Sequence, residues 1–188
     1  MFQENQIEKK EKPEILYIAT QTKGIKEFIP RRGNVRSDEE GAVIFSTPNK
    51  ELASMFLING HEDSWTRIAY LGGVPYVVIC MNREEFIEKD KGGVMYEVPS
   101  DTFDFNPNLG MGEKEWTSRV PVKPIMETTY SSSLDTMIQN GVNVYFVDKP
   151  TFDAINNSAD HGFEILLTLT SENKRIGKVL RPLEDLRK

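Results

Sequence analysis

The chain has 188 residues, of which 38% are hydrophobic and 28% are charged. This balance is typical of a globular protein and excludes wholesale disorder, and at this length one domain can bury about 70% of the surface that its unfolded chain exposes. The formal net charge of -6 argues against general nucleic-acid binding and against attachment to an anionic membrane.

The N-terminal residues 1–13 are mostly polar and charged, which predicts a disordered tail. Neither a signal-peptide pattern nor an apolar stretch long enough to cross a bilayer is present, so we expect a cytoplasmic protein. Residues 14–188 are predicted to form a single α+β domain, because short strands and short helices follow one another without a repeat or a low-complexity linker. Residues 142–188 are a possible C-terminal extension of that domain.

Apolar runs and helix signals divide the first part of the chain. Strands are predicted at residues 15–20, 42–47, 67–71, 76–81 and 94–98, where β-branched and aromatic residues cluster. A helix is predicted to begin at Pro48 with Thr47 as its N-cap, because the hydroxyl can accept from an unpaired backbone N–H and proline loses no needed donor. A second helix begins after Asn82, which forms a capping-box pattern with Glu85. The lone cysteine, Cys80, lies in an apolar run, and we expect it in the core.

The second part of the chain alternates in the same way. Residues 99–111 are rich in turn residues yet carry two phenylalanines, which is typical of a loop that folds over a site. A strand is predicted from Glu113, and further strands at residues 125–130 and 142–147. Helices are predicted at residues 133–141, 150–157 and 176–186. Residues 163–169 read equally well as a strand or as a buried helix.

Two carboxylates stand two residues apart in the strand predicted from Glu113. If the run is extended, Glu113 and Glu115 share a face, because strand side chains alternate with period two. On the wall of a cleft the pair could supply a general base and a fixed anion beside a centre that develops positive charge. The competing interpretation is a solvated edge strand with its ordinary load of charge.

Three short segments resemble the signature of the ADP-ribosyltransferase-like superfamily. They are Leu-Tyr-Ile-Ala-Thr at residues 16–20, Phe-Ser-Thr at residues 45–47 leading into a helix, and Glu-Lys-Glu-Trp-Thr-Ser at residues 113–118. The resemblance implies a split antiparallel sheet with short helices that grips NAD, as substrate or ligand, in its cleft. It also implies that Glu115, or Glu113, steadies an oxocarbenium-like transition state as nicotinamide leaves. The nucleotide-binding residues that it implies are Tyr17, Thr20, Phe45, Ser46 and Thr47.

A group of basic residues could bind the phosphates of such a ligand. Arg31, Arg32 and Arg36, with Lys23 and Lys26 nearby, could clamp a pyrophosphate through bidentate guanidinium contacts. The alternative is that they are solvated loop charges that balance the acidic residues at 38–40.

Metal and thiol chemistry are not predicted. His61 and His161 are far apart in sequence, and neither has a cysteine or a second histidine at metal-ligand spacing, so we expect no metal. The apolar surroundings of Cys80 are wrong for a nucleophilic thiolate. Gly110-Met111-Gly112 lacks the spacing of a dinucleotide-binding or phosphate-binding glycine loop.

Three classes of function therefore remain. The first is an enzyme that transfers ADP-ribose to a target or hydrolyses NAD. The second is a module that sequesters a nucleotide without turnover. It is favoured by Ile18, because many members of the superfamily have a histidine or arginine in the first strand and isoleucine cannot hydrogen-bond ribose hydroxyls. The third is an interaction domain that binds a protein target and no small ligand.

Overall fold

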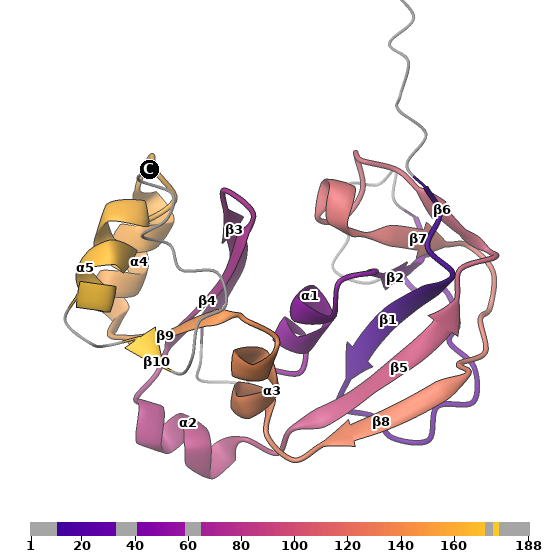
Figure 1. Ribbon diagram of the computed structural model, residues 1–188, viewed down its shortest axis with the longest axis horizontal. Coiled ribbons are helices and arrows are strands. Elements are labelled where there is room, and N and C mark those ends of the chain that lie inside the picture. The colour runs from indigo at the N-terminus through magenta and orange to yellow at the C-terminus, as the bar shows by residue number, and fades with distance from the viewer. Residues whose placement is uncertain (1–10, 33–40, 59–64, 172–174, 177–188) are drawn as a thin grey trace, which may run out of the picture.

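The computed structural model describes residues 11–32, 41–58, 65–171 and 175–176. Most of the predicted N-terminal tail and most of the helix predicted at residues 176–186 lie outside the described residues, as do Arg36 and His61. The described residues form an α+β structure with three small sheets and five short α-helices (Figure 1). None of these helices is long and apolar enough to span a membrane.

Two of the sheets are antiparallel and meet at one backbone contact. The first contains β1 (Ile15–Thr20), β5 (Gly93–Pro99) and β8 (Met126–Tyr130) in the order β1-β5-β8. The second contains β2 (Ile44–Ser46), β7 (Trp116–Ser118) and β6 (Phe103–Phe105) in the order β2-β7-β6. The N–H of Tyr17 donates to the Thr47 carbonyl at 2.7 Å, and the N–H of Thr47 donates to the Tyr17 carbonyl at 3.1 Å. This pair of bonds sets β1 beside the end of β2.

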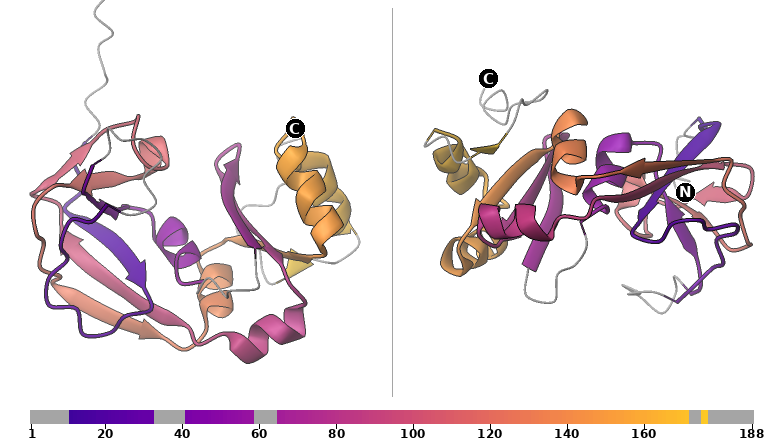
Figure 2. Two further views of the ribbon diagram at one scale, coloured as in Figure 1. Left: turned by 180° about the vertical axis from the view of Figure 1, so that it is seen from behind. Right: turned by 90° about the horizontal axis from the view of Figure 1, so that it is seen from below.

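The third sheet is mixed and has the order β10-β9-β4-β3. Its strands are β3 (Trp65–Leu71), β4 (Val74–Cys80), β9 (Asn143–Val147) and β10 (Arg175–Ile176), and only β4 and β9 pair in parallel. Around this sheet lie α1 (Lys50–Met55), α2 (Arg83–Lys89), α3 (Ser133–Gln139), α4 (Lys149–Asn157) and α5 (Phe163–Ser171). In Figures 1 and 2, α1 and α3 lie between this sheet and the β1-β5-β8 sheet.

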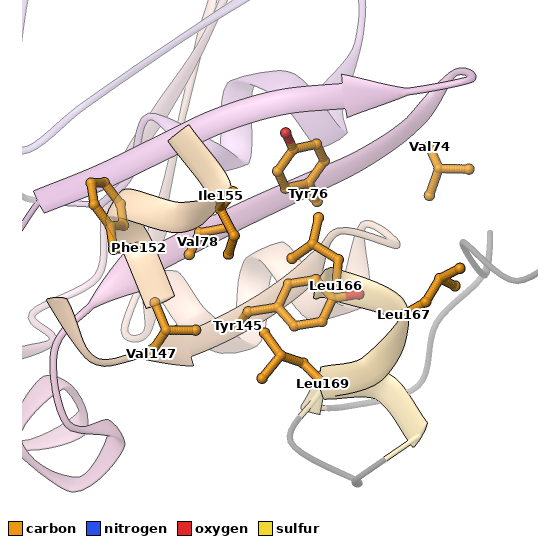
Figure 3. Close-up of a cluster of buried hydrophobic side chains, with 10 residues drawn as sticks. All are labelled: Val74, Tyr76, Val78, Tyr145, Val147, Phe152, Ile155, Leu166, Leu167 and Leu169. Atoms are coloured by element: carbon orange, nitrogen blue, oxygen red, sulfur yellow. The ribbon is translucent and has the colours of Figure 1, made fainter. Parts of the chain in front are cut away.

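Strand β4 is buried on both faces and contributes side chains to two of the hydrophobic clusters. Its side chains alternate, as period two requires: Tyr76 and Val78 join a cluster with residues of α4 and α5 (Figure 3), whereas Val77 and Ile79 join a cluster with residues of α1 and α3. Full burial of each such aliphatic side chain stabilises the fold by about 1.5–3 kcal/mol. The prediction of strands at residues 67–71 and 76–81 is confirmed.

Several local predictions need correction. The N-cap position of helix α1 is Asn49, whose side chain makes no capping hydrogen bond, and not Thr47. The backbone of Thr47 pairs with Tyr17, and its hydroxyl accepts from the Asn49 N–H at 3.1 Å. The predicted loop at residues 99–111 contains β6. Residues 163–169, for which both readings were open, are helical. The cap predicted at Asn82 is confirmed, since its side chain accepts from the Glu84 N–H at 2.9 Å.

Candidate functional site

A pocket of about 580 Å³ lies where β1 meets β2, within the size range of small-molecule sites, roughly 300–1,000 Å³. Its walls come from β1, β2, α1 and the segment that leads into β7. Most of the residues singled out in the sequence line it: Tyr17, Thr20, Arg31, Phe45, Ser46, Thr47 and Glu115. Segments that are distant along the chain are thus brought together in one cavity.

The strand registers explain why Glu115 faces this pocket. Phe45 of β2 pairs with Thr117 of β7, so the two side chains share one face of the sheet. Glu115 lies two residues before Thr117 with an extended backbone, φ -122° and ψ 148°, and therefore lies on that same face. Phe45 and Glu115 accordingly line the pocket together.

The Glu115 carboxylate is buried and hydrogen-bonded to the main chain. Its side chain belongs to a residue that is only 8% exposed, and its Oε2 accepts from the N–H of Met111. A backbone N–H can only donate, so Oε2 is the acceptor of this bond. The group that faces the pocket is thus held in one orientation.

The strand predicted from Glu113 begins later, and the prediction of one extended run through Glu113 and Glu115 is wrong. Residues Gly112–Lys114 form a 3-10 turn, η1. The turn closes where the N–H of Glu115 donates to the Gly112 carbonyl at 3.2 Å, so β7 begins only at Trp116. The side chain of Glu113 lies outside what the structure describes.

The two neighbouring arginines differ in position. The Arg31 backbone pairs with Val43 through bonds of 3.3 and 3.2 Å, and Arg31 lines the pocket. Both arginines are exposed, and Arg32 is not part of the lining. Among the described lining residues, Arg31 carries the one cationic side chain and Glu115 the one anionic side chain.

The pocket hydroxyls have local backbone contacts. Thr20 Oγ1 accepts from the Thr22 N–H at 3.2 Å, and Thr47 Oγ1 accepts from the Asn49 N–H at 3.1 Å. These bonds use the oxygen lone pairs and not the hydroxyl hydrogens, which are a hydroxyl's donors. Ser46 Oγ donates to the Trp116 carbonyl at 3.4 Å. The hydroxyl hydrogens of Thr20 and Thr47 can thus still donate to a polar ligand.

Sequence reasoning missed much of the apolar wall and the turn that holds Glu115. Val43, Phe56, Gly110 and Met111 also line the pocket, beside Ile18, which the sequence analysis had singled out. The two glycines on either side of Met111 could have indicated this turn. They stand immediately before the candidate carboxylates, where a tight turn would set the direction of the side chains.

A second hollow of about 480 Å³ lies beside β6 and β7. Residues 104–109 line it together with Thr117 and Arg119. Asp104 pairs with Thr117 in the β6–β7 register, so this hollow continues the sheet face that carries Phe45 and Glu115. Residues 106–109 thus line this hollow, whereas Gly110 and Met111 line the pocket beside Glu115.

The other candidate groups take no part in the pocket. Cys80 is partly buried against the cluster around Tyr76, and burial raises the pKa of its thiol, which opposes a nucleophilic role. His161 Nδ1 lies 3.5 Å from an Arg67 guanidinium nitrogen. In the part of the chain that the structure describes, no group of three or more potential metal ligands is found.

Comparisons of the chain with protein-family models, with curated proteins and with solved structures found no significant match.

Proposed function

We propose that this pocket binds NAD or a closely related nucleotide, and that the protein transfers ADP-ribose to a target or hydrolyses NAD. On this proposal β1-β5-β8 and β2-β7-β6 are the two halves of a split antiparallel sheet of the ADP-ribosyltransferase-like kind. One observation carries the proposal: the three segments that resemble that superfamily contribute Thr20, Ser46 and Glu115 to a single pocket.

The charges and surfaces of the pocket suit such a ligand. Arg31 offers a planar donor to a phosphate, and Phe45 and Phe56 offer apolar surface to a ring. Glu115 would lie beside the ribose carbon that gains positive charge as its bond to nicotinamide breaks, and an oriented anion stabilises that charge. In hydrolysis, water adds to this carbon, the electron pair of the broken bond stays with nicotinamide, and a proton is released.

A matched pair of arginine variants tests the ligand assignment. Arg31→Gln is expected to raise the Kd for NAD about tenfold, because a charge-assisted contact to phosphate is lost. Arg32→Gln should leave the Kd within about twofold, since an exposed charge outside the pocket contributes little. Isothermal titration calorimetry measures both. Equal effects of the two substitutions, or no binding of NAD to the unmodified protein, would contradict the assignment.

A second candidate is a module that holds the nucleotide without turnover, and Ile18 favours it. This side chain lines the pocket, where a histidine or arginine would hydrogen-bond ribose. Long incubation with NAD followed by mass spectrometry distinguishes the two functions: intact NAD supports the module, whereas free nicotinamide supports the enzyme. The pocket beside Glu115 gives the third class, an interaction domain without a small ligand, no support.

A further inference from the structure

The turn before β7 brings its backbone unusually close to Glu115. Gly110 has φ +53°, in the left-handed region that favours glycine. A Cβ atom at this position would lie 2.2 Å from Glu115 Oε2 and 2.8 Å from Phe45 Cε1. Neither distance is compatible with a side chain, so any other residue at 110 must displace the carboxylate, the ring or the turn.

The same turn supplies the hydrogen bond that orients the carboxylate. Met111, the next residue, donates its N–H to Glu115 Oε2. The rest of the turn is held separately: the Leu109 N–H donates to the Asn106 carbonyl at 3.1 Å, and the Gly112 N–H donates to the Leu109 carbonyl at 2.9 Å. The contact with Glu115 can therefore be lost while the other bonds of the turn remain.

We propose that Gly110 is a positioning residue for Glu115. Its left-handed backbone aims the Met111 N–H at the carboxylate, and its missing side chain leaves the space that the carboxylate occupies against Phe45. This deepens the proposed function and rests on it, because the orientation of Glu115 affects a rate only if Glu115 faces reacting atoms. A small misplacement of such a group is costly, since about 1 Å can reduce a rate about 100-fold.

The test compares Gly110→Ala with Gly112→Ala in the full-length chain. Gly112 also has a positive φ, +64°, but a Cβ there meets only the Pro107 carbonyl oxygen, at 3.3 Å. Amide hydrogen exchange followed by NMR is the first readout, and it needs no enzymatic activity. Gly110→Ala should reduce the protection of the Met111 amide at least tenfold and leave the Leu109 amide protected. Gly112→Ala should leave the Met111 amide within about threefold of the unmodified protein.

Nicotinamide release is the second readout. Gly110→Ala should lower kcat about tenfold and leave KM for NAD within about twofold, as expected when a group that acts on the transition state is displaced. Equal loss of Met111 protection in both alanine variants, or retention in both, would overturn the positioning role. Absence of nicotinamide release from the unmodified protein would contradict the proposed function alone, and the exchange result would still decide the role of Gly110.

A second variant covers the case in which Gly110→Ala does not fold. Asparagine tolerates the left-handed region better than alanine does, so Gly110→Asn relieves the backbone strain but keeps the clash of the Cβ atom with Glu115. It should lose Met111 protection as the alanine variant does. A Gly110→Asn protein that keeps this protection would overturn the inference, because space for the carboxylate would then not be required.

Discussion

Replacing Glu115 with glutamine is expected to lower kcat for nicotinamide release about 100- to 1,000-fold, the loss typical of removing one oriented electrostatic group from an active site. Glutamine has nearly the same shape, and its amide oxygen can still accept from the Met111 N–H. The change therefore removes the charge and keeps the packing of this buried position, so the Kd for NAD should stay within about threefold. Steady-state kinetics and calorimetry measure the two quantities.

The control for this experiment is Glu88→Gln, which removes the same charge from an exposed position on α2. It should leave kcat within about twofold. A Glu115→Gln protein that releases nicotinamide at the unmodified rate would show that Glu115 does not act on the reacting centre. Tight NAD binding without release by the unmodified protein would favour the non-catalytic module.

The second large effect is expected at Asp90, which joins the end of α2 to the start of α3. Its Oδ1 accepts from the N–H groups of Gly92 at 2.9 Å and Ser133 at 3.0 Å. Its Oδ2 accepts from Ser132 Oγ at 2.9 Å and the Leu134 N–H at 3.1 Å. An asparagine at position 90 would keep one acceptor oxygen, and its NH₂ group would face two hydrogen-bond donors without accepting from them. Asp90→Asn should lower the free energy of unfolding by about 2–3 kcal/mol, which corresponds to a Tm lower by about 4–12 °C.

The loss of unfolding free energy caused by Asp90→Asn should depend on pH. Burial raises the pKa of Asp90, but hydrogen bonds from the N–H groups of Ser133, Gly92 and Leu134 outweigh burial and hold the pKa below its ordinary value. Because the pKa is lowered in the folded state, the stabilisation is complete above the unfolded-state pKa, about 4, and is lost as pH falls through the folded-state pKa. The difference between Asp90→Asn and the unmodified protein should therefore be largest near neutral pH and shrink below about pH 4.

Denaturant unfolding at several pH values measures this difference. Asp101→Asn is the control, because Asp101 is an exposed turn residue and the hydrogen bond from Lys12 goes to its backbone carbonyl. The control should change the free energy of unfolding by less than about 0.5 kcal/mol. If the free energies of unfolding of Asp90→Asn and the unmodified protein differ by the same amount at pH 3 and at pH 7, the charge of Asp90 does not contribute to stability.

Much of the strand pattern could be predicted because it depends on local composition. The run at residues 76–81 is continuously apolar, and β4 proves to be buried on both faces. The run from Glu113 was predicted wrongly, because a backbone bond to Gly112 and the approach of Gly110 to the carboxylate decide its shape. Those are contacts of a folded turn, and the period of side chains along a strand does not contain them. The assignment of Thr47 as a helix cap was wrong for a similar reason. Its backbone pairs with Tyr17, and the local sequence does not reveal such a long-range contact.

By itself, the sequence determined the residue types that the pocket offers: a carboxylate at Glu115, hydroxyls at Thr20 and Ser46, and a guanidinium at Arg31. It also determined where most strands lie, because burial and turn propensity act over a few residues. The tertiary structure decided that Arg31 lines the pocket and Arg32 does not. It decided too that Met111 holds the Glu115 carboxylate. Both depend on how β1, β2 and β7 are joined, and pairing between distant strands is set by the packing of the whole fold.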